Sequence, residues 1–303
     1  MPGEALEYLG CKPGGIYVDG TVGGGGHALE ILKKSSPGGT LIGLDRDAEA
    51  IEAAKETLKG FKERTVLVKE NFRNIPSVLA VLGIREVDGI LLDLGVSSYQ
   101  LERPERGFSF RMEARLDMRM DTGDETTAYG LVNGLEGKEL EKIFREYGEE
   151  RFSRKIARAI VEARKRGPVE TTTELAGIIL GAIPRRFHGG NIHPATRVFQ
   201  ALRIAVNDEL GSLEDGLKGG MDSLKKGGRM AVISFHSLED RIVKETFRDS
   251  SSPCVCPPRL PRCACGRVAT VRLLTKRPVT PADEEIGRNP RSRSAKLRAV
   301  ERI

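Results

Sequence analysis

The first hundred residues place an aspartate at the end of three separate apolar runs, and this pattern constrains the fold most strongly. The runs at 16–18, 40–44 and 87–92 end at Asp19, Asp45 and Asp93. Stretches with helical spacing separate these short, β-rich runs, so they predict parallel strands linked by helices. Because the carboxyl ends of parallel strands meet at one edge, where open α/β sheets bind ligands, the three carboxylates are candidate site residues.

The alternation of strands and helices stops after about residue 101 and resumes near residue 226. A run at 66–68 completes the first set of strands, and runs at 230–233, 268–274 and 297–300 predict three more. From about 138 to 216, apolar residues recur at helical spacing, as at Phe152, Ile156 and Ile160. We therefore predict an α/β core formed by residues 1–103 and 206–303, with an all-helical insertion at residues 104–205.

A glycine-rich loop joins the first predicted strand to a helix. Gly23, Gly25 and Ala28 satisfy the G-x-G-x-x-G/A pattern of dinucleotide sites, and Asp45 follows at the distance of a ribose-binding acid. A nicotinamide-dependent oxidoreductase is therefore one hypothesis. Asp19 before the glycines and Asp93 after the fourth strand favour S-adenosylmethionine instead, because Asp19 is placed to hold the amino acid end of that donor. No clear Tyr/Lys or His/acid pair typical of a dehydrogenase follows.

Several further motifs resemble one known family over nearly the whole chain. The matching segments are YVDGT at 17–21, GGH at 25–27, GLDRD at 43–47, DGILLDLGVSS at 88–98 followed by Gln100, RGFSF at 106–110, LDMRMD at 116–121, YGEE at 147–150, HPATR at 193–197, ISFHSLED at 233–240 and NPRSR at 289–293. In these segments the chain resembles the RsmH (MraW) family of 16S rRNA methyltransferases. The glycine loop alone is a weak signal, whereas the middle and late motifs together are specific.

The resemblance implies a fold, a cofactor and a reaction. The fold is the Rossmann-like sheet of class I S-adenosylmethionine-dependent methyltransferases with an inserted helical domain. The reaction is methylation of the N4 amine of one cytidine in the decoding (P-site) region of 16S rRNA. The family's donor-binding positions fall on Gly25, Gly26, His27, Asp45, Phe72, Asp93 and Gln100. Asp45 would take the ribose hydroxyls and Phe72 would pack near the adenine. The loop itself adds Asp19 and Gly23.

Methylation of a cytosine amine requires activation of the amine, because the nitrogen lone pair is delocalised into the ring. A hydrogen-bond acceptor beside N4 favours a nucleophilic nitrogen held in line with the methyl group. We expect this acceptor to be the Asp93 carboxylate or the Leu94 carbonyl. His236, which follows the fifth predicted strand, is a second catalytic candidate that could contact the cytidine or its phosphate, or could serve only as a turn residue.

The charge distribution fits an RNA partner. Lys and Arg total 49 against 43 Asp and Glu, giving a net charge of +6, and nine basic residues oppose four acidic ones from Arg272 onward. Within the family motifs, the candidate RNA-binding residues are Arg106, Arg119, Arg197, Arg291 and Arg293. A non-catalytic RNA-binding ribosome assembly factor remains an alternative. The partner we expect is 16S rRNA within the small ribosomal subunit. The sequence also permits a homodimer.

No apolar run approaches the roughly 18 residues of a membrane-spanning helix, and the first residues show neither a basic start nor an apolar stretch. We therefore expect a cytoplasmic protein without a membrane partner.

Four of the five cysteines, Cys254, Cys256, Cys263 and Cys265, lie within twelve residues. They could bind a structural zinc ion, although C-x-C is a strained spacing for one metal. Reduced thiols or a disulfide are the alternatives.

Overall fold

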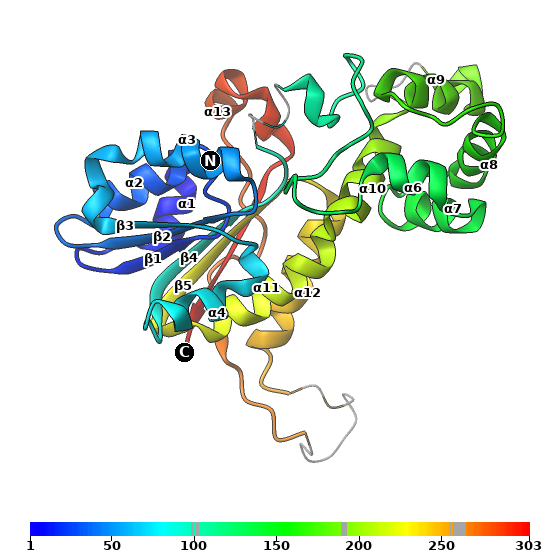
Figure 1. The fold of residues 1–303 in the computed structure, drawn as a ribbon. Coiled ribbons are helices and arrows are strands. Elements are labelled where there is room, and N and C mark those ends of the chain that lie inside the picture. Colours follow the sequence, from blue (N-terminus) through cyan, green and yellow to red (C-terminus); the bar gives the residue numbers. More distant parts are fainter. Residues whose placement is uncertain (98–99, 101–102, 189–192, 255, 257–264) are drawn as a thin grey trace. The chain divides into compact units, whose positions relative to one another are not determined.

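The computed structural model describes the whole chain except residues 98–99, 101–102, 189–192, 255 and 257–264 (Figure 1). It divides into two compact units. The sheet unit comprises Met1–Gly95 and Leu210–Ile303, and the helical unit comprises Val96–Glu209. The expected domain boundaries at 103/104 and 205/206 both fall inside the helical unit. Among the described residues, no helix combines the length and the apolar character that crossing a membrane requires.

Seven strands form one sheet in the order β3-β2-β1-β4-β5-β7-β6, and each of the seven expected runs overlaps one of them. Their bounds are β1 Ile16–Asp19, β2 Thr40–Asp45, β3 Thr65–Lys69, β4 Val87–Asp93, β5 Leu224–Ser234, β6 Val271–Leu273 and β7 Lys296–Arg302. Strands β1 to β5 pair in parallel, whereas β7 is antiparallel to both β5 and β6. This strand order is that of the class I methyltransferase sheet.

The sheet is buried on both faces because its strands are almost continuously apolar. On one face, Val18, Ile42 and Ile90 pack with α4, α11 and α12; on the other, Leu41 and Leu91 pack with α1, α2 and α3 (Figure 1). Neighbouring residues on a strand thus serve opposite faces, as the two-residue period requires. The helices are α1 Pro2–Leu9, α2 Gly26–Lys34, α3 Ala48–Thr57, α4 Ile75–Val81, α11 Glu209–Asp222, α12 Ser237–Ser251 and α13 Asp283–Arg288.

The helical unit has a hydrophobic core of its own. Its helices are α6 Ala128–Gly134, α7 Gly137–Glu146, α8 Ser153–Ala163, α9 Thr172–Ala182 and α10 Thr196–Asn207. Phe144, Ile156, Ile160 and Leu202 are almost fully buried within one cluster. Short 3-10 helices lie at Lys59–Arg64, Phe72–Asn74, Pro104–Arg106, Arg185–Phe187 and Pro290–Ser294. The periodic stripe expected from the sequence around Ile156 and Ile160 is therefore the buried face of α8.

The strand order places three acidic side chains at one edge of the sheet. The chain leaves β1 toward β2 on one side, and β4 lies on the other side, so the order reverses between β1 and β4. Asp19 pairs in register with Gly43 of β2 and Leu91 of β4. Asp45 and Asp93 each lie two residues beyond these partners, at the same carboxyl edge. Such a reversal is where open α/β sheets bind their ligands.

Candidate active site

The glycine loop between β1 and α2 is anchored to both neighbouring strands. The Gly20 amide donates to the Leu91 carbonyl (2.9 Å) and the Val22 amide to the Leu44 carbonyl (2.8 Å). Gly25 then caps α2 with φ +85°. A residue with a side chain rarely adopts this backbone conformation, and a Cβ at this position would lie 3.2 Å from Cβ of Thr57. The loop therefore brings bare backbone and a helix N-terminus to the carboxyl edge.

Asp45 holds this loop in place. Its Oδ2 accepts a hydrogen bond from the Gly23 amide (3.0 Å), and its Oδ1 accepts one from the Asp47 amide (2.9 Å). Burial raises the pKa of Asp45 to about 6. Each carboxylate oxygen has a second lone pair, so the two backbone contacts leave acceptor capacity for the hydroxyls of a sugar.

Asp19 is the most deeply buried acid at the edge, with 1% of its surface exposed. Its Oδ1 accepts a hydrogen bond from the Thr21 amide (3.2 Å). Burial raises the pKa of Asp19 to about 7, although the nearby His27 opposes the increase. Its Oδ2 has no hydrogen-bond partner among the described residues. A buried carboxylate with one unused oxygen is suited to a positively charged or hydrogen-bond-donating ligand.

Asp93 pairs with His27 across the edge. His27 Nε2 lies 3.3 Å from Asp93 Oδ2, and the Asp93 amide donates to Thr21 Oγ1 (2.6 Å). Burial alone would lower the pKa of His27, but the hydrogen bond and charge of Asp93 outweigh burial and raise it. The sequence offered no signal for this pair, because 66 positions separate two residues that become neighbours only when β1 and β4 pair.

A cavity of about 220 Å³ adjoins the pair and lies wholly within the sheet unit. Its lining includes Gly26, His27, Asp93, Phe235, Asn289 and Ser292. In the described part of the chain, His27 Nδ1 and Asp93 Oδ1 are also buried without a hydrogen-bond partner. Leaving such a group unsatisfied costs about 1–3 kcal/mol. The cavity therefore has the polar groups of a binding site, and its volume suits one small planar group better than a whole drug-sized ligand.

Phe72 follows β3 and packs beside the glycine loop. A Cβ on Gly20 would lie 3.0 Å from Cβ of Phe72, and one on Gly216 of α11 would lie 2.5 Å from its ring. Two glycines thus make room for this aromatic side chain at the edge. Gln100, by contrast, belongs to the helical unit, where its side-chain oxygen accepts a hydrogen bond from the Ser97 amide (3.0 Å).

His236 caps the N-terminus of α12. Its Nδ1 accepts a hydrogen bond from the Glu239 amide (3.4 Å), and Glu239 accepts hydrogen bonds in return from the amides of Phe235 (2.8 Å) and His236 (3.3 Å). Nε2 of His236 lies 3.1 Å from the other Glu239 oxygen. This reciprocal capping box gives His236 a structural role through Nδ1. Its Nε2, by contrast, is buried without a hydrogen-bond partner among the described residues, so capping does not account for the whole side chain.

The five candidate RNA-binding arginines fall into two groups. Arg106 is buried and donates to the carbonyls of Arg119 and Met120, while Arg119 makes a paired contact with Asp117 (both 2.8 Å). These two guanidinium groups hold the helical unit together. Arg197, Arg291 and Arg293 are exposed. Of these three, Arg197 also donates to the Glu149 carbonyl (3.1 Å).

Class I methyltransferases have this strand order, with an acid-lined glycine loop at its point of reversal, and they take their methyl group from S-adenosylmethionine. The family model described as "MraW methylase family" matches residues 1–303, and the chain belongs to that family. The nicotinamide hypothesis is accordingly set aside.

Two relatives illustrate the similarity. Ribosomal RNA small subunit methyltransferase H of Geobacter sulfurreducens is 59% identical over 303 residues, covering 100% of this chain and 97% of that protein. The protein of the same name from Pelobacter propionicus is 57% identical over 304 residues, with the same coverage. A solved rRNA methylase from Streptococcus thermophilus aligns with a TM-score of 0.43 at 10% identity, covering 100% of this chain and 93% of that one. The fold class rests on the chain's own strand order.

Proposed function

We propose that this enzyme transfers a methyl group from S-adenosylmethionine to the N4 amine of a cytidine in the decoding (P-site) region of small-subunit rRNA. The observation that carries the proposal is the group of buried, partnerless polar atoms that the described residues place at the reversal of the sheet: Asp19 Oδ2, His27 Nδ1 and Asp93 Oδ1. The names of the relatives, small-subunit rRNA methyltransferases, support the substrate class.

The residues at the edge fit the methyl donor. When bound, the donor supplies an electrophilic methyl group on a positively charged sulfur. Asp45 would accept the ribose hydroxyls, and Phe72 would pack against the adenine. An ammonium group against Asp19 Oδ2 would provide the missing partner and favour the ionised carboxylate. Gly23, Gly25 and Gly26 keep the loop free of side chains there, and the helical unit's Gln100 remains a further donor-binding candidate.

Asp93 is our candidate acceptor for the amine. Within the described structure its Oδ1 is buried and unpaired, its Oδ2 is held by His27, and the residue lines the cavity. A carboxylate fixed in this way can accept a hydrogen bond from N4 and orient the nitrogen lone pair toward the methyl group. The cavity beside it would take the cytosine ring, which must be turned out of the RNA to reach the edge.

Exposed arginines would contact the RNA backbone. Arg291 and Arg293 lie in the sheet unit and Arg197 in the helical unit, so both units carry cations that suit phosphates. We place the reaction in the cytoplasm, where small subunits are assembled. A homodimer stays a prediction that light scattering would check.

The test separates donor binding from transfer. Asp93→Asn keeps the side chain's shape but removes its charge, so it should bind S-adenosylmethionine within a few-fold of the unmodified enzyme and lose about 10²–10³-fold in turnover. Donor affinity is measured by calorimetry. Turnover is measured on small subunits from a strain lacking the modification, with the methylated nucleoside identified by mass spectrometry.

His236→Asn is the matched variant, because asparagine is also a strong N-cap residue. Wild-type turnover in His236→Asn would limit His236 to capping, whereas a large loss without destabilisation would assign it to the chemistry. Unchanged turnover in Asp93→Asn would refute the acceptor role. Donor binding by the unmodified enzyme without methylation of small subunits would favour a non-catalytic assembly factor, and any product other than N4-methylcytidine would rule out the proposed position.

A further inference from the structure

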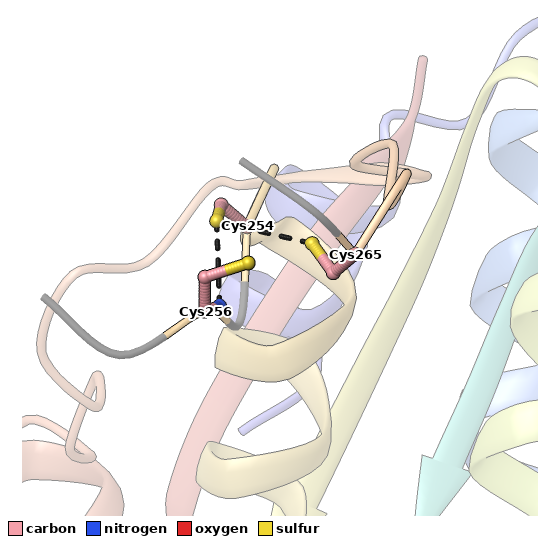
Figure 2. A group of neighbouring side chains, drawn as sticks. All are labelled: Cys254, Cys256 and Cys265. Atoms are coloured by element: carbon pink, nitrogen blue, oxygen red, sulfur yellow. Dashed lines mark hydrogen bonds between the residues drawn. The ribbon is translucent and has the colours of Figure 1, made fainter. Parts of the chain in front are cut away.

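Three cysteines gather in the segment between α12 and β6, away from the carboxyl edge described above. The sulfur atoms of Cys254, Cys256 and Cys265 all lie within 4.8 Å of one another (Figure 2). They come from the two sides of the loop, Cys254 and Cys256 soon after α12 and Cys265 before β6. Cys263, the remaining cysteine of this part of the sequence, lies outside the described residues.

The sulfur spacing distinguishes a metal site from a disulfide. Sγ of Cys265 lies 3.8 Å from Sγ of Cys254. A disulfide requires about 2.05 Å between its sulfur atoms. Zinc binds thiolates at about 2.3 Å in tetrahedral geometry, which sets its ligand sulfurs about 3.8 Å apart. The Cys254 and Cys265 sulfurs are therefore too far apart for a disulfide, and this spacing, which two hydrogen-bonded thiols also give, fits two ligands of one zinc ion.

The backbone near Cys254 favours a thiolate. The amide of Cys256 donates a hydrogen bond to Sγ of Cys254 (3.4 Å), as Figure 2 shows. A hydrogen bond of this kind stabilises the negative charge that a metal ligand must carry. The C-x-C spacing is unfavourable for zinc when a tight turn alone must bring the Cys254 and Cys256 sulfurs to the metal. In the structure, Cys265 from the opposite side of the loop completes the group.

We propose that Cys254, Cys256 and Cys265 bind one Zn²⁺ ion as thiolates, and that the ion links the chain just after α12 to the chain before β6. Each thiol that binds releases its proton to solvent, so affinity should rise with pH. Three protein ligands leave one tetrahedral position for a further ligand. The ion would be structural, because methyl transfer needs no metal and the site lies on a different part of the sheet unit from the glycine loop.

The experiment measures metal binding directly. The full chain is purified without added metal and its zinc is measured by elemental analysis, before and after titration with Zn²⁺ against a chromophoric chelator. We expect about one tightly bound zinc per chain, falling below a tenth in the double variant Cys254→Ser/Cys265→Ser. Cobalt(II) should give the intense visible bands of a tetrahedral thiolate site in the unmodified protein.

Cys11→Ser is the matched control. Burial raises the pKa of the Cys11 thiol to about 11, so this cysteine should not contribute a thiolate, and its variant should bind zinc like the unmodified protein. Zinc binding that survives in the double variant would overturn the proposal. So would an unmodified protein that takes up neither zinc nor cobalt, or one in which mass spectrometry finds a Cys254–Cys265 disulfide after purification in reducing, zinc-containing buffer.

Discussion

Replacing Asp19 with asparagine should stabilise the donor-free enzyme while weakening donor binding. Burial raises the pKa of Asp19 to about 7 from its usual value of 3.8. When a carboxyl has a higher pKa in the folded state than in the unfolded state, its favourable contribution to the free energy of unfolding is complete below the unfolded-state pKa. This contribution is lost as the pH rises through the folded-state pKa. Each pKa unit corresponds to about 1.4 kcal/mol, so ionisation destabilises the fold by about 4 kcal/mol between pH 4 and pH 8.

Asparagine has no ionisable group, so the Asp19→Asn variant should escape this loss. The new amide is still a buried, unsatisfied group, which costs about 1–3 kcal/mol, so the net gain at pH 8 should be about 1–3 kcal/mol. The decisive quantity is the pH dependence of the difference in free energy of unfolding between variant and unmodified protein. It should grow by about 3 kcal/mol from pH 5 to pH 8 and stay constant above that.

Urea unfolding at pH 5, 6, 7 and 8 without S-adenosylmethionine measures this difference. The exposed Asp215, which pairs with Arg73 on the surface, provides the control: Asp215→Asn should show no comparable change over this pH range. A stability difference for Asp19→Asn that does not vary with pH would refute the reasoning, since it would mean that Asp19 is ionised in the folded state throughout.

Two further substitutions test the loop and a buried ion pair. Gly25→Ala should cost about 1–2 kcal/mol in urea unfolding and weaken donor binding in calorimetry, because φ is +85° and the new Cβ would crowd Thr57. Gly60→Ala, which meets no atom within 4 Å, should be nearly neutral; equal effects would contradict the backbone argument. Asp240→Ala should cost about 2–3 kcal/mol at pH 7, because it removes the carboxylate that pairs with the buried Arg298 (2.7 Å away). Burial opposes ionisation of Asp240, but hydrogen bonds from basic neighbours lower its pKa, so this loss should shrink on acidification; a pH-independent loss would count against the pair.

Much of the fold could be predicted because it follows from local pattern. Short β-rich runs separated by helical spacing specify parallel strands, and the residue after such a run necessarily lies at the carboxyl edge. Asp19, Asp45 and Asp93 were therefore located from the sequence alone, as was the glycine loop. The motifs beyond the loop could be assigned a function only through the family resemblance, because nothing in their spacing identifies a cytidine.

Long-range pairing accounts for what local pattern could not predict. The basic excess near the C-terminus is partly neutralised within the fold, where Arg272 pairs with Glu301 (2.7 Å) and both Lys296 and Arg298 pair with Asp240. Arg106 has the same residue type as exposed Arg291, yet it is buried. A count of charges cannot distinguish cations that face a partner from cations that hold strands together.

The sequence by itself determined the order of strands and helices and the edge on which three aspartates lie, because each depends on neighbours a few residues apart. Only the tertiary structure decided that His27 pairs with Asp93, that His236 caps a helix and that Cys265 returns to Cys254. These contacts depend on how the chain packs in space, which brings together side chains and backbone groups that the order of residues leaves unassigned.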